Sequence, residues 1–470
     1  MKPESRSVDP PRNRAQTGLR IALVLFAAFG FLRMSVSFVE FTPWIPKVDF
    51  NARYNEVLCL RAGHDPYDVF TGKVSIPCVV SMADLPSLSV VPLMQRLPSY
   101  PDFGKEGQKE MAIHAYPPWS YAWLVPWTLV PRDVAWAFHL LAEILSLAVL
   151  FVVPARYISK SGGSSLSVLA FVALAANLGK VFPASFMCGN YSLFVAAGAV
   201  GLAHFLDGNR SVPAGLCFAL MMLKPQIGAI FAIPLLVGRK FAAVGIAAAA
   251  CLAGTALSSF LCGTSMIDLI RHSNAAGPVF FQGTALVPWK LFPWSKTTAF
   301  PLVPACAAFG SVACALLSWR LRRLESWFAK LAPVAVCSLF WMVARTYDHA
   351  ILLLPLAVAL FALDAGRSVP EPLRASLWVL LSAMFLRNFN PVVGEKALFL
   401  CREFSARFGI DLAPLFDLRT AVASFCWAVQ PLLFVPLAAV LSECLRMGMD
   451  NSGRTASDSR PSVVPDSGFC

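Results

Sequence analysis

Long apolar stretches separated by short polar breaks make up most of the chain. The first stretch covers about residues 18–41 and is long enough to cross a bilayer, which takes about 20 apolar residues in a helix. Further stretches follow between residues 135 and 441, without the alternation of apolar and polar positions that marks a barrel strand. The pattern predicts an all-α helical bundle with about twelve membrane crossings.

One long polar interval, residues 42–118, follows the first span, and we expect it to be a long extracytoplasmic loop. Residues 1–17 are expected to be a cytoplasmic N-terminal segment and residues 18–446 a single transmembrane domain. Residues 447–470 are rich in Ser, Asp, Pro and Arg, which predicts a disordered cytoplasmic tail. Residues 119–131 are apolar and aromatic, but a stretch of about 13 residues favours a position at the membrane interface over a span.

Composition and charge agree with a membrane protein. Hydrophobic residues make up 57% of the chain, charged residues 14%, and the mean hydropathy is +0.63, whereas soluble domains carry about 25% charge. The net charge of +12 does not indicate nucleic-acid binding, because the basic residues lie in short clusters between apolar stretches. We therefore expect an integral, multi-pass protein of a bacterial inner or plasma membrane.

The basic clusters also bear on topology. If residues 119–131 stay at the outer face, all of the clusters between the spans become cytoplasmic, as the positive-inside rule requires. If residues 119–131 span the membrane instead, Arg156, Lys160 and Arg210 move to the outside. The first arrangement is preferred, and it makes the two short apolar stretches around Lys224 a half-length helical hairpin whose tip faces outward.

Asp49 is the sharpest candidate for chemistry. It follows the first span and lies between Val48 and Phe50, so its carboxylate is expected half in water and half against apolar groups. Burial would raise its pKa, and a cation such as Arg53 would lower it. Such a group can take a proton from an attacking sugar hydroxyl. A solvated loop carboxylate or a helix N-cap is an equally good interpretation.

Two more segments of this loop contain turn residues. Residues 63–67 read Gly-His-Asp-Pro-Tyr, which predicts a turn that Asp65 caps or braces, with Tyr67 at the interface. Residues 116–118 read Tyr-Pro-Pro and predict a rigid lead-in to the interfacial segment. We expect structural or acceptor-side roles for Asp65, Tyr67 and Tyr116.

Polar breaks recur farther along. Lys224 precedes a proline inside an apolar stretch, and it either binds a lipid-linked phosphate or extends from an ordinary loop toward the interface. Arg345 and His349 either bind phosphate with Asp348 orienting them, or belong to a salt-bridged turn. Asn190, in a Gly-Asn-Tyr-Ser break, is expected to cap a helix.

As a set, these segments resemble the membrane glycosyltransferases of glycosyltransferase family 87, which have the GT-C fold and include polyprenyl-phosphomannose-dependent α-mannosyltransferases. The family pattern has Asp-Phe after the first span, Gly-x-Asp-Pro-Tyr, Tyr-Pro-Pro, a Gly-Gln-x-Asn break and a Lys-Pro break. This chain matches it in order between about residues 20 and 240, except that Asn190 and Ser192 replace Gln and Asn. The same sugar is therefore not assumed.

The resemblance implies transfer of a mannose-like hexose from a polyprenyl-phosphate sugar to a glycan or glycolipid acceptor, outside the cytoplasm and with inversion. Asp49 would be the general base. Lys224, Arg345 and His349 would stabilise the leaving phosphate, with Arg61 as a weaker candidate. No metal or other cofactor is expected, because the leaving group is a monophosphate and the loop has no DxD motif. The Cys and His spacings also give no sign of a metal site.

Two other functions compete with the enzyme. A transporter or flippase for a lipid-linked or anionic solute would have ionisable residues near the bilayer midplane in repeated broken helices. Here the clearest acid lies at the end of a span, which favours the enzyme. An inactive scaffold with the same fold is the third possibility, because the Gly-Asn-Tyr-Ser break departs from the family pattern.

Overall fold

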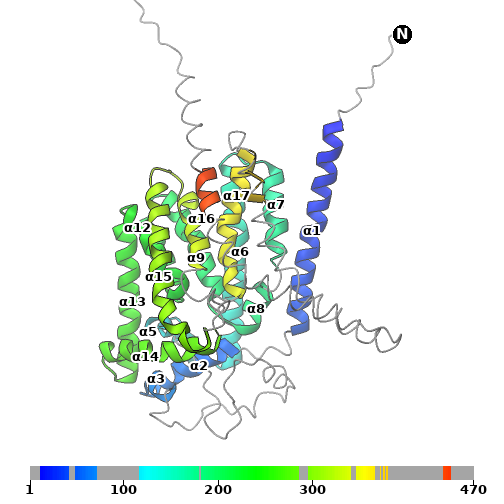
Figure 1. Cartoon of the computed structure of the whole chain (residues 1–470). Coiled ribbons are helices and arrows are strands. Elements are labelled where there is room, and N and C mark those ends of the chain that lie inside the picture. Colours follow the sequence, from blue (N-terminus) through cyan, green and yellow to red (C-terminus); the bar gives the residue numbers. More distant parts are fainter. Residues whose placement is uncertain are drawn as a thin grey trace, which may run out of the picture.

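The computed structural model describes residues 11–41, 48–70, 116–178, 181–284, 295–339, 346–365 and 438–445, with residues 371, 374–375 and 377–378. Among these residues there are helices and turns but no strands (Figure 1). The helices are α1 (Pro11–Phe41), α2 (Val48–Arg61), α3 (Pro66–Phe70), α5 (Pro118–Ala122), η3 (Pro126–Leu129), α6 (Arg132–Lys160), α7 (Ser165–Ala176), α8 (Val181–Cys188), α9 (Ser192–Asp207), α10 (Ser211–Met221), α11 (Pro225–Gly228), η4 (Ala229–Phe231), α12 (Ala232–Val237), α13 (Phe241–Cys262), α14 (Met266–Thr284), α15 (Ser295–Arg320), α16 (Trp327–Ser338), η6 (Thr346–Leu352) and α17 (Leu353–Ala365). The all-α class is confirmed for the described part of the chain.

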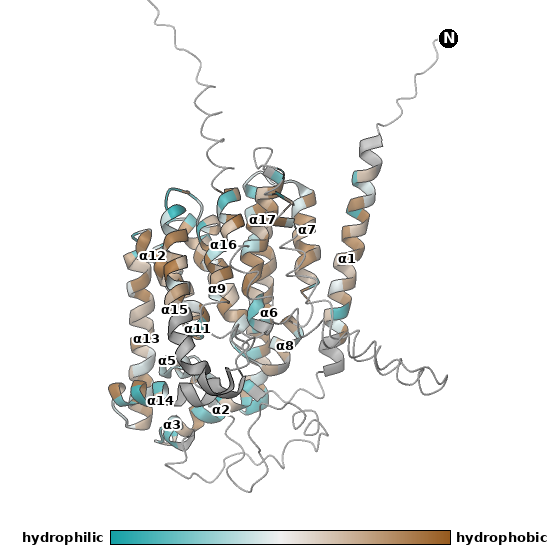
Figure 2. Ribbon diagram, viewed as in Figure 1, coloured by the Kyte–Doolittle hydropathy of each residue, from teal (hydrophilic) through white to brown (hydrophobic). Residues whose placement is uncertain are grey.

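Three of the described helices are long and apolar enough to cross a membrane: Ala15–Val36 within α1, α6 and α13. Shorter apolar helices accompany them, and the long helices are mostly hydrophobic along their length (Figure 2). Large apolar side chains such as Leu25, Leu145 and Phe260 are exposed, as lipid-facing residues are. The chain is a membrane protein. The count of about twelve crossings stays a prediction, because several predicted spans lie outside the described residues.

The centre of the bundle is α9. Only His204, Phe205 and Asp207 among its residues are not buried, and α6, α10, α16, η6 and α17 all contact it. Two glycines bring α10 close: a Cβ on Gly198 would lie 2.9 Å from the Cys217 carbonyl oxygen, and one on Gly201 would lie 2.8 Å from the Cys217 sulfur. Small residues at a helix–helix contact are how membrane helices approach each other closely.

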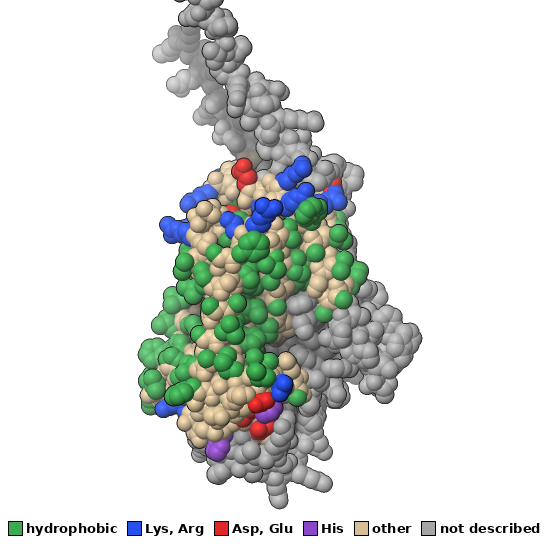
Figure 3. Space-filling model, turned by 90° about the vertical axis from the view of Figure 1, so that its left-hand side faces the viewer, with side chains coloured by type: hydrophobic (Ala, Val, Ile, Leu, Met, Phe, Trp, Pro, Cys, Tyr) green, Lys and Arg blue, Asp and Glu red, His purple; other side chains and the backbone are tan. Residues whose placement is uncertain are grey.

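One end of the bundle is basic. The loop between α9 and α10 meets the loop between α12 and α13 there, where Lys240 donates to Asn209 at 3.0 Å. Lys240 and Lys330 also lie over the ring of Trp327. Figure 3 shows Lys and Arg side chains gathered at this end, beyond a hydrophobic belt. From this end α10 runs inward and α11, η4 and α12 return, with Lys224 at the turn. The two short stretches thus form the predicted helical hairpin, and the outward direction of its tip stays a prediction.

The opposite end is covered by α2, α3, α5 and α14 (Figure 1). The described part of the interval predicted as a loop is therefore helical in α2, of 14 residues, and in α3, of five. Residues 119–131 form only α5, a turn and η3, because prolines at 126 and 131 interrupt a longer helix. They do not form a span. Trp119 of this segment donates to the Met222 carbonyl at 2.7 Å and packs against Gly254 of α13.

Candidate active site

One face of α2 carries three buried ionisable residues. Asp49, Arg53 and Glu56 follow the i, i+4, i+7 spacing of a helix face, and none of them is more than 7% exposed. Arg53 Nε donates to Glu56 Oε2 at 2.7 Å, and Nη2 donates to Oε1 at 3.3 Å. Asp49 lies in the first turn of α2, where the helix dipole favours a carboxylate. The sequence analysis missed Glu56, although its helical spacing from Asp49 was a usable signal.

Tyrosine rings surround the guanidinium of Arg53. The Arg53 Cζ atom lies 4.2 Å from the centroid of the Tyr116 ring, which is the geometry of a cation–π contact. The Tyr116 and Tyr191 rings meet edge to face, with centroids 5.2 Å apart. The Tyr67 hydroxyl donates a hydrogen bond to the Tyr116 carbonyl oxygen and so holds this arrangement in place. Of the residues predicted for the acceptor side, Tyr116 thus contacts the α2 face directly.

Three polar segments that interrupt apolar stretches far apart in the sequence come together in the structure. Their side chains form a second polar group, the Ser192–Lys224–Asp348 cluster. Lys224 Nζ donates to Ser192 Oγ at 2.7 Å and to Asp348 Oδ1 at 2.8 Å. Ser192 Oγ donates to the same Asp348 oxygen at 2.6 Å. All three side chains are buried. Asn190 Oδ1 accepts from Ser192 N at 2.8 Å and so caps the start of α9.

Tyr116 joins the α2 face to the Ser192–Lys224–Asp348 cluster. Burial raises the pKa of its phenol well above the ordinary value, and the negative charges of Asp49 and of Asp348 both add to the rise. Because Tyr116 contacts Arg53 of the α2 face and also Tyr191, which precedes Ser192, the two groups lie next to each other at one end of α9. Among the described residues, Arg53 Nη1, the Tyr191 hydroxyl and Asn190 Nδ2 are buried without a hydrogen-bond partner. Such groups and aromatic faces suit the hydroxyls and ring of a sugar.

Helix α6 brings two further buried groups that the sequence analysis missed. Glu143 Oε1 accepts from Ser185 Oγ at 3.3 Å and lies 3.9 Å from Nε2 of His139. Glu143 interacts electrostatically with Asp49. The ring of Phe50, next to Asp49, lies 5.1 Å from the His139 ring. Two ionisable residues at i and i+4 inside an apolar stretch were the available signal.

The remaining predicted residues lie apart or outside the description. Arg61 is exposed, and its Nη1 donates to the Thr128 carbonyl and hydroxyl, so it braces η3. Asp65 accepts from Tyr67 N at 2.9 Å, which is the capping contact expected of a turn. His349 follows Asp348 and is buried. Arg345 lies outside the described residues.

Gly189 permits the close packing beside Asp49. Its φ of +63° is left-handed, and a Cβ would lie 2.6 Å from Trp136 Cζ3 and 2.7 Å from Phe50 Cβ. We expect Gly189→Ala to lower the free energy of unfolding by about 1–3 kcal/mol, as overpacking does. Gly63→Ala is the control, because Gly63 also has a positive φ, +83°, but nothing lies within 4 Å of its Cβ position. Equal losses in chemical unfolding would contradict the packing role.

Glu56 should make stability depend on pH. Burial raises its pKa from 4.5 to about 7, although Arg53 opposes the shift. The folded chain therefore keeps a proton that the unfolded chain releases, and this stabilisation is complete below about pH 4.5 and lost as the pH rises through about 7. We expect the unfolding temperature to fall more between about pH 5 and about pH 8 in the wild type than in Glu56→Gln. Parallel pH profiles would contradict this.

Comparison with known families supports the resemblance of the motifs. Residues 114–343 match the model of glycosyltransferase family 87. No curated protein and no solved structure matches the chain. The matched residues include Tyr116, Ser192 and Lys224, whereas Asp49 and Asp348 lie on either side of the matched segment. The match covers residues 119–131, the central helix α9 and the hairpin that carries Lys224. Over residues 114–343, close to half of its length, the chain belongs to glycosyltransferase family 87.

Proposed function

We propose that the chain transfers a mannose-like hexose from a polyprenyl-phosphate sugar to a glycan or glycolipid, with inversion at the anomeric carbon. One observation supports this most directly: Tyr116 lies within electrostatic reach of Asp49, a buried acid, and of Asp348, whose carboxylate holds the buried cation Lys224. Glycosyl transfer with a phosphate leaving group needs a base for the acceptor and positive charge for the phosphate.

Asp49 is the general base in this proposal. Among the three carboxylates on this side of the site, Glu56 is bonded to Arg53 and Glu143 is fully buried in α6. Asp49 is 7% exposed at the start of α2. It takes the proton of the acceptor hydroxyl as that oxygen bonds to the anomeric carbon, while the bond from this carbon to the phosphate oxygen breaks. A base must reach the proton that it removes.

Lys224 and His349 bind the departing phosphate in this proposal, and Arg345 remains a further candidate. Lys224 is held beside the first residue of α9, where the helix dipole favours an anion. Arg53, with its unpaired Nη1, binds hydroxyls of the transferred sugar or of the acceptor. The site is extracytoplasmic because the basic loops lie at the opposite end of the bundle and would be cytoplasmic.

The donor class is tested with membranes that contain the wild-type chain and matched membranes that lack it. Each is given a radiolabelled polyprenyl-phosphate mannose or a labelled nucleotide sugar. We expect label to pass from the lipid donor to a glycan or glycolipid only when the chain is present, with inverted configuration in the product. Transfer from the nucleotide sugar alone would contradict the proposal.

The same donor in proteoliposomes separates the enzyme from a transporter. A transporter moves the lipid-linked sugar between leaflets without forming a glycosylated product. Flux of the labelled donor with no product, when acceptor glycans are supplied on both sides, would favour the transporter. Product formation that requires the chain would exclude an inactive scaffold.

A further inference from the structure

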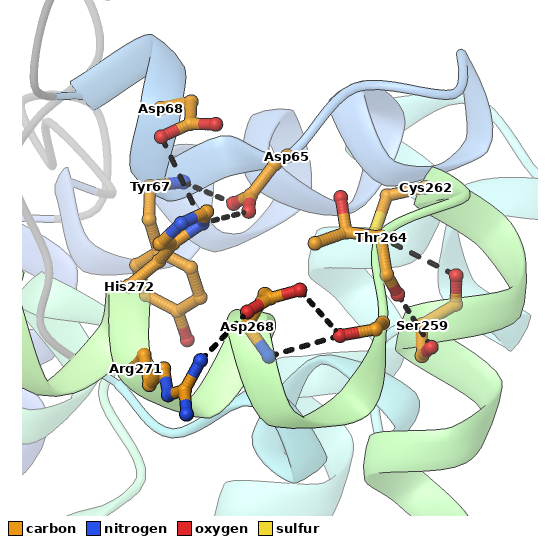
Figure 4. Close-up of polar contacts among 10 residues, drawn as sticks. Asp65, Tyr67, Asp68, Ser259, Cys262, Thr264, Asp268, Arg271 and His272 are labelled. Atoms are coloured by element: carbon orange, nitrogen blue, oxygen red, sulfur yellow. Dashed lines mark hydrogen bonds and ion pairs between the residues drawn. The ribbon is translucent and has the colours of Figure 1, made fainter.

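Three metal-binding side chains meet outside the active site. Asp65 precedes α3, Asp68 lies in its first turn, and His272 comes from α14, 207 positions from Asp65. His272 Nδ1 lies 2.7 Å from Asp65 Oδ2 and 3.7 Å from Asp68 Oδ1. Figure 4 shows both carboxylates directed at the His272 ring. One ligand atom from each residue lies within 4.8 Å of the others.

The cluster is recessed and held in place by its surroundings. The side chain of Asp65 is only 4% exposed, and those of Asp68 and His272 are 24% and 29% exposed. Asp65 Oδ1 accepts from Tyr67 N at 2.9 Å, which leaves Oδ2 facing the imidazole. A ligand oriented by a second hydrogen bond is characteristic of built metal sites.

One ring nitrogen of His272 faces two carboxylates. A single ring nitrogen offers at most one N–H, and that proton serves one carboxylate at a time. The two carboxylates repel each other, and a divalent cation between them would offset both charges. Metal–ligand bonds of about 2.0–2.2 Å place tetrahedral ligand atoms about 3.4 Å apart. The two observed distances, 2.7 and 3.7 Å, lie on either side of that separation.

We propose that Asp65, Asp68 and His272 bind one divalent transition-metal ion, with water completing its coordination. One imidazole with two carboxylates suits Mn²⁺ or Zn²⁺, whereas Ca²⁺ and Mg²⁺ prefer oxygen ligands alone. The ion joins the turn before α3 to α14. Tyr67 of that turn bonds to the Tyr116 carbonyl, so the ion also steadies the Tyr116 ring against Arg53.

Mn²⁺ binding to the purified, full-length protein in detergent tests the site. Mn²⁺ is the probe because cysteine thiolates bind Mn²⁺ weakly, whereas they bind Zn²⁺ strongly. Electron paramagnetic resonance measures the free ion. We expect one tightly bound Mn²⁺ per wild-type chain, displaced by Zn²⁺, and a higher unfolding temperature with the ion. His272→Gln and Asp68→Asn should each weaken binding at least about tenfold.

Two control variants make the same chemical changes nearby. His64→Gln alters an exposed histidine in the turn before Asp65, and Asp268→Asn alters an exposed carboxylate on α14, one turn from His272. Both should keep Mn²⁺ binding and the metal-dependent rise in unfolding temperature. Equal Mn²⁺ binding by wild type and Asp68→Asn would overturn the proposal, and so would equal losses in the controls. If His272→Gln fails to fold, Asp68→Asn still tests the site, because the Asp68 side chain is partly exposed and its substitution disturbs the fold less.

Discussion

Asp49→Asn should abolish most sugar transfer while leaving the protein folded. Asparagine keeps the size and polarity of the side chain but takes up no proton from the acceptor. Loss of a positioned general base typically lowers the rate about 10²–10⁴-fold. The negative charge of Asp49 stabilises helix α2 by only about 0.3–1 kcal/mol through its interaction with the helix dipole. The Arg53–Glu56 pair of α2 stays intact in the variant. Initial rates with a polyprenyl-phosphate sugar donor measure the effect.

The matched control is Asp133→Asn. Asp133 is also an acid in the first turn of a helix, α6, but its side chain is exposed. The control should keep both activity and unfolding temperature. Glu143→Gln addresses the other carboxylate beside Asp49. If Glu143→Gln stops transfer and Asp49→Asn does not, the base is Glu143 and our assignment is wrong.

Lys224→Met should lower both stability and activity. Lys224 is buried and bonds Asp348 and Ser192, so its removal leaves the Asp348 carboxylate buried without this cation. Breaking one partner of a buried ion pair costs about 3–5 kcal/mol. The phosphate would also lose a cation in the transition state. Chemical unfolding in detergent and the transfer assay measure the two losses separately.

The double variant Lys224→Met/Asp348→Leu separates the two roles of Lys224. Replacing both partners removes the stranded charge, so stability should recover in part and the double-mutant cycle should give a coupling energy. Activity should stay lost if Lys224 binds the donor phosphate. Recovery of activity with stability would make the lysine structural only. Arg271→Gln, in the exposed pair with Asp268, is the control and should change stability little.

The sequence predicted well what depends on local pattern. Apolar length located the membrane helices that the structure describes, the short hairpin around Lys224 and the failure of residues 119–131 to form a span. Local hydrogen-bonding chemistry predicted that Asp65 braces a turn and that Asn190 caps a helix. The family resemblance rested on the same local segments and was confirmed.

Helix α2 shows where local pattern was read incompletely. The interval after the first span was expected to be a loop because it is polar, yet part of it forms a helix whose buried face carries Arg53 and Glu56. A polar helix of this kind is stabilised by tertiary burial more than by its own periodicity. The buried acid of α6, Glu143, was missed although its place inside an apolar stretch, four residues from His139, was a usable signal.

By itself, the sequence determined the membrane class, the family and the breaks in which polar residues gather, because hydrophobic length, proline and turn chemistry act over a few neighbouring residues. Only the tertiary structure decided which breaks meet. Asp348 lies 124 positions from Lys224, and His272 lies 207 positions from Asp65. Those meetings depend on how the helices pack around α9, including the close approach of α10 at Gly198. The free energy of packing is the sum of many small contacts between distant segments, and a local sequence pattern does not show which segments make them.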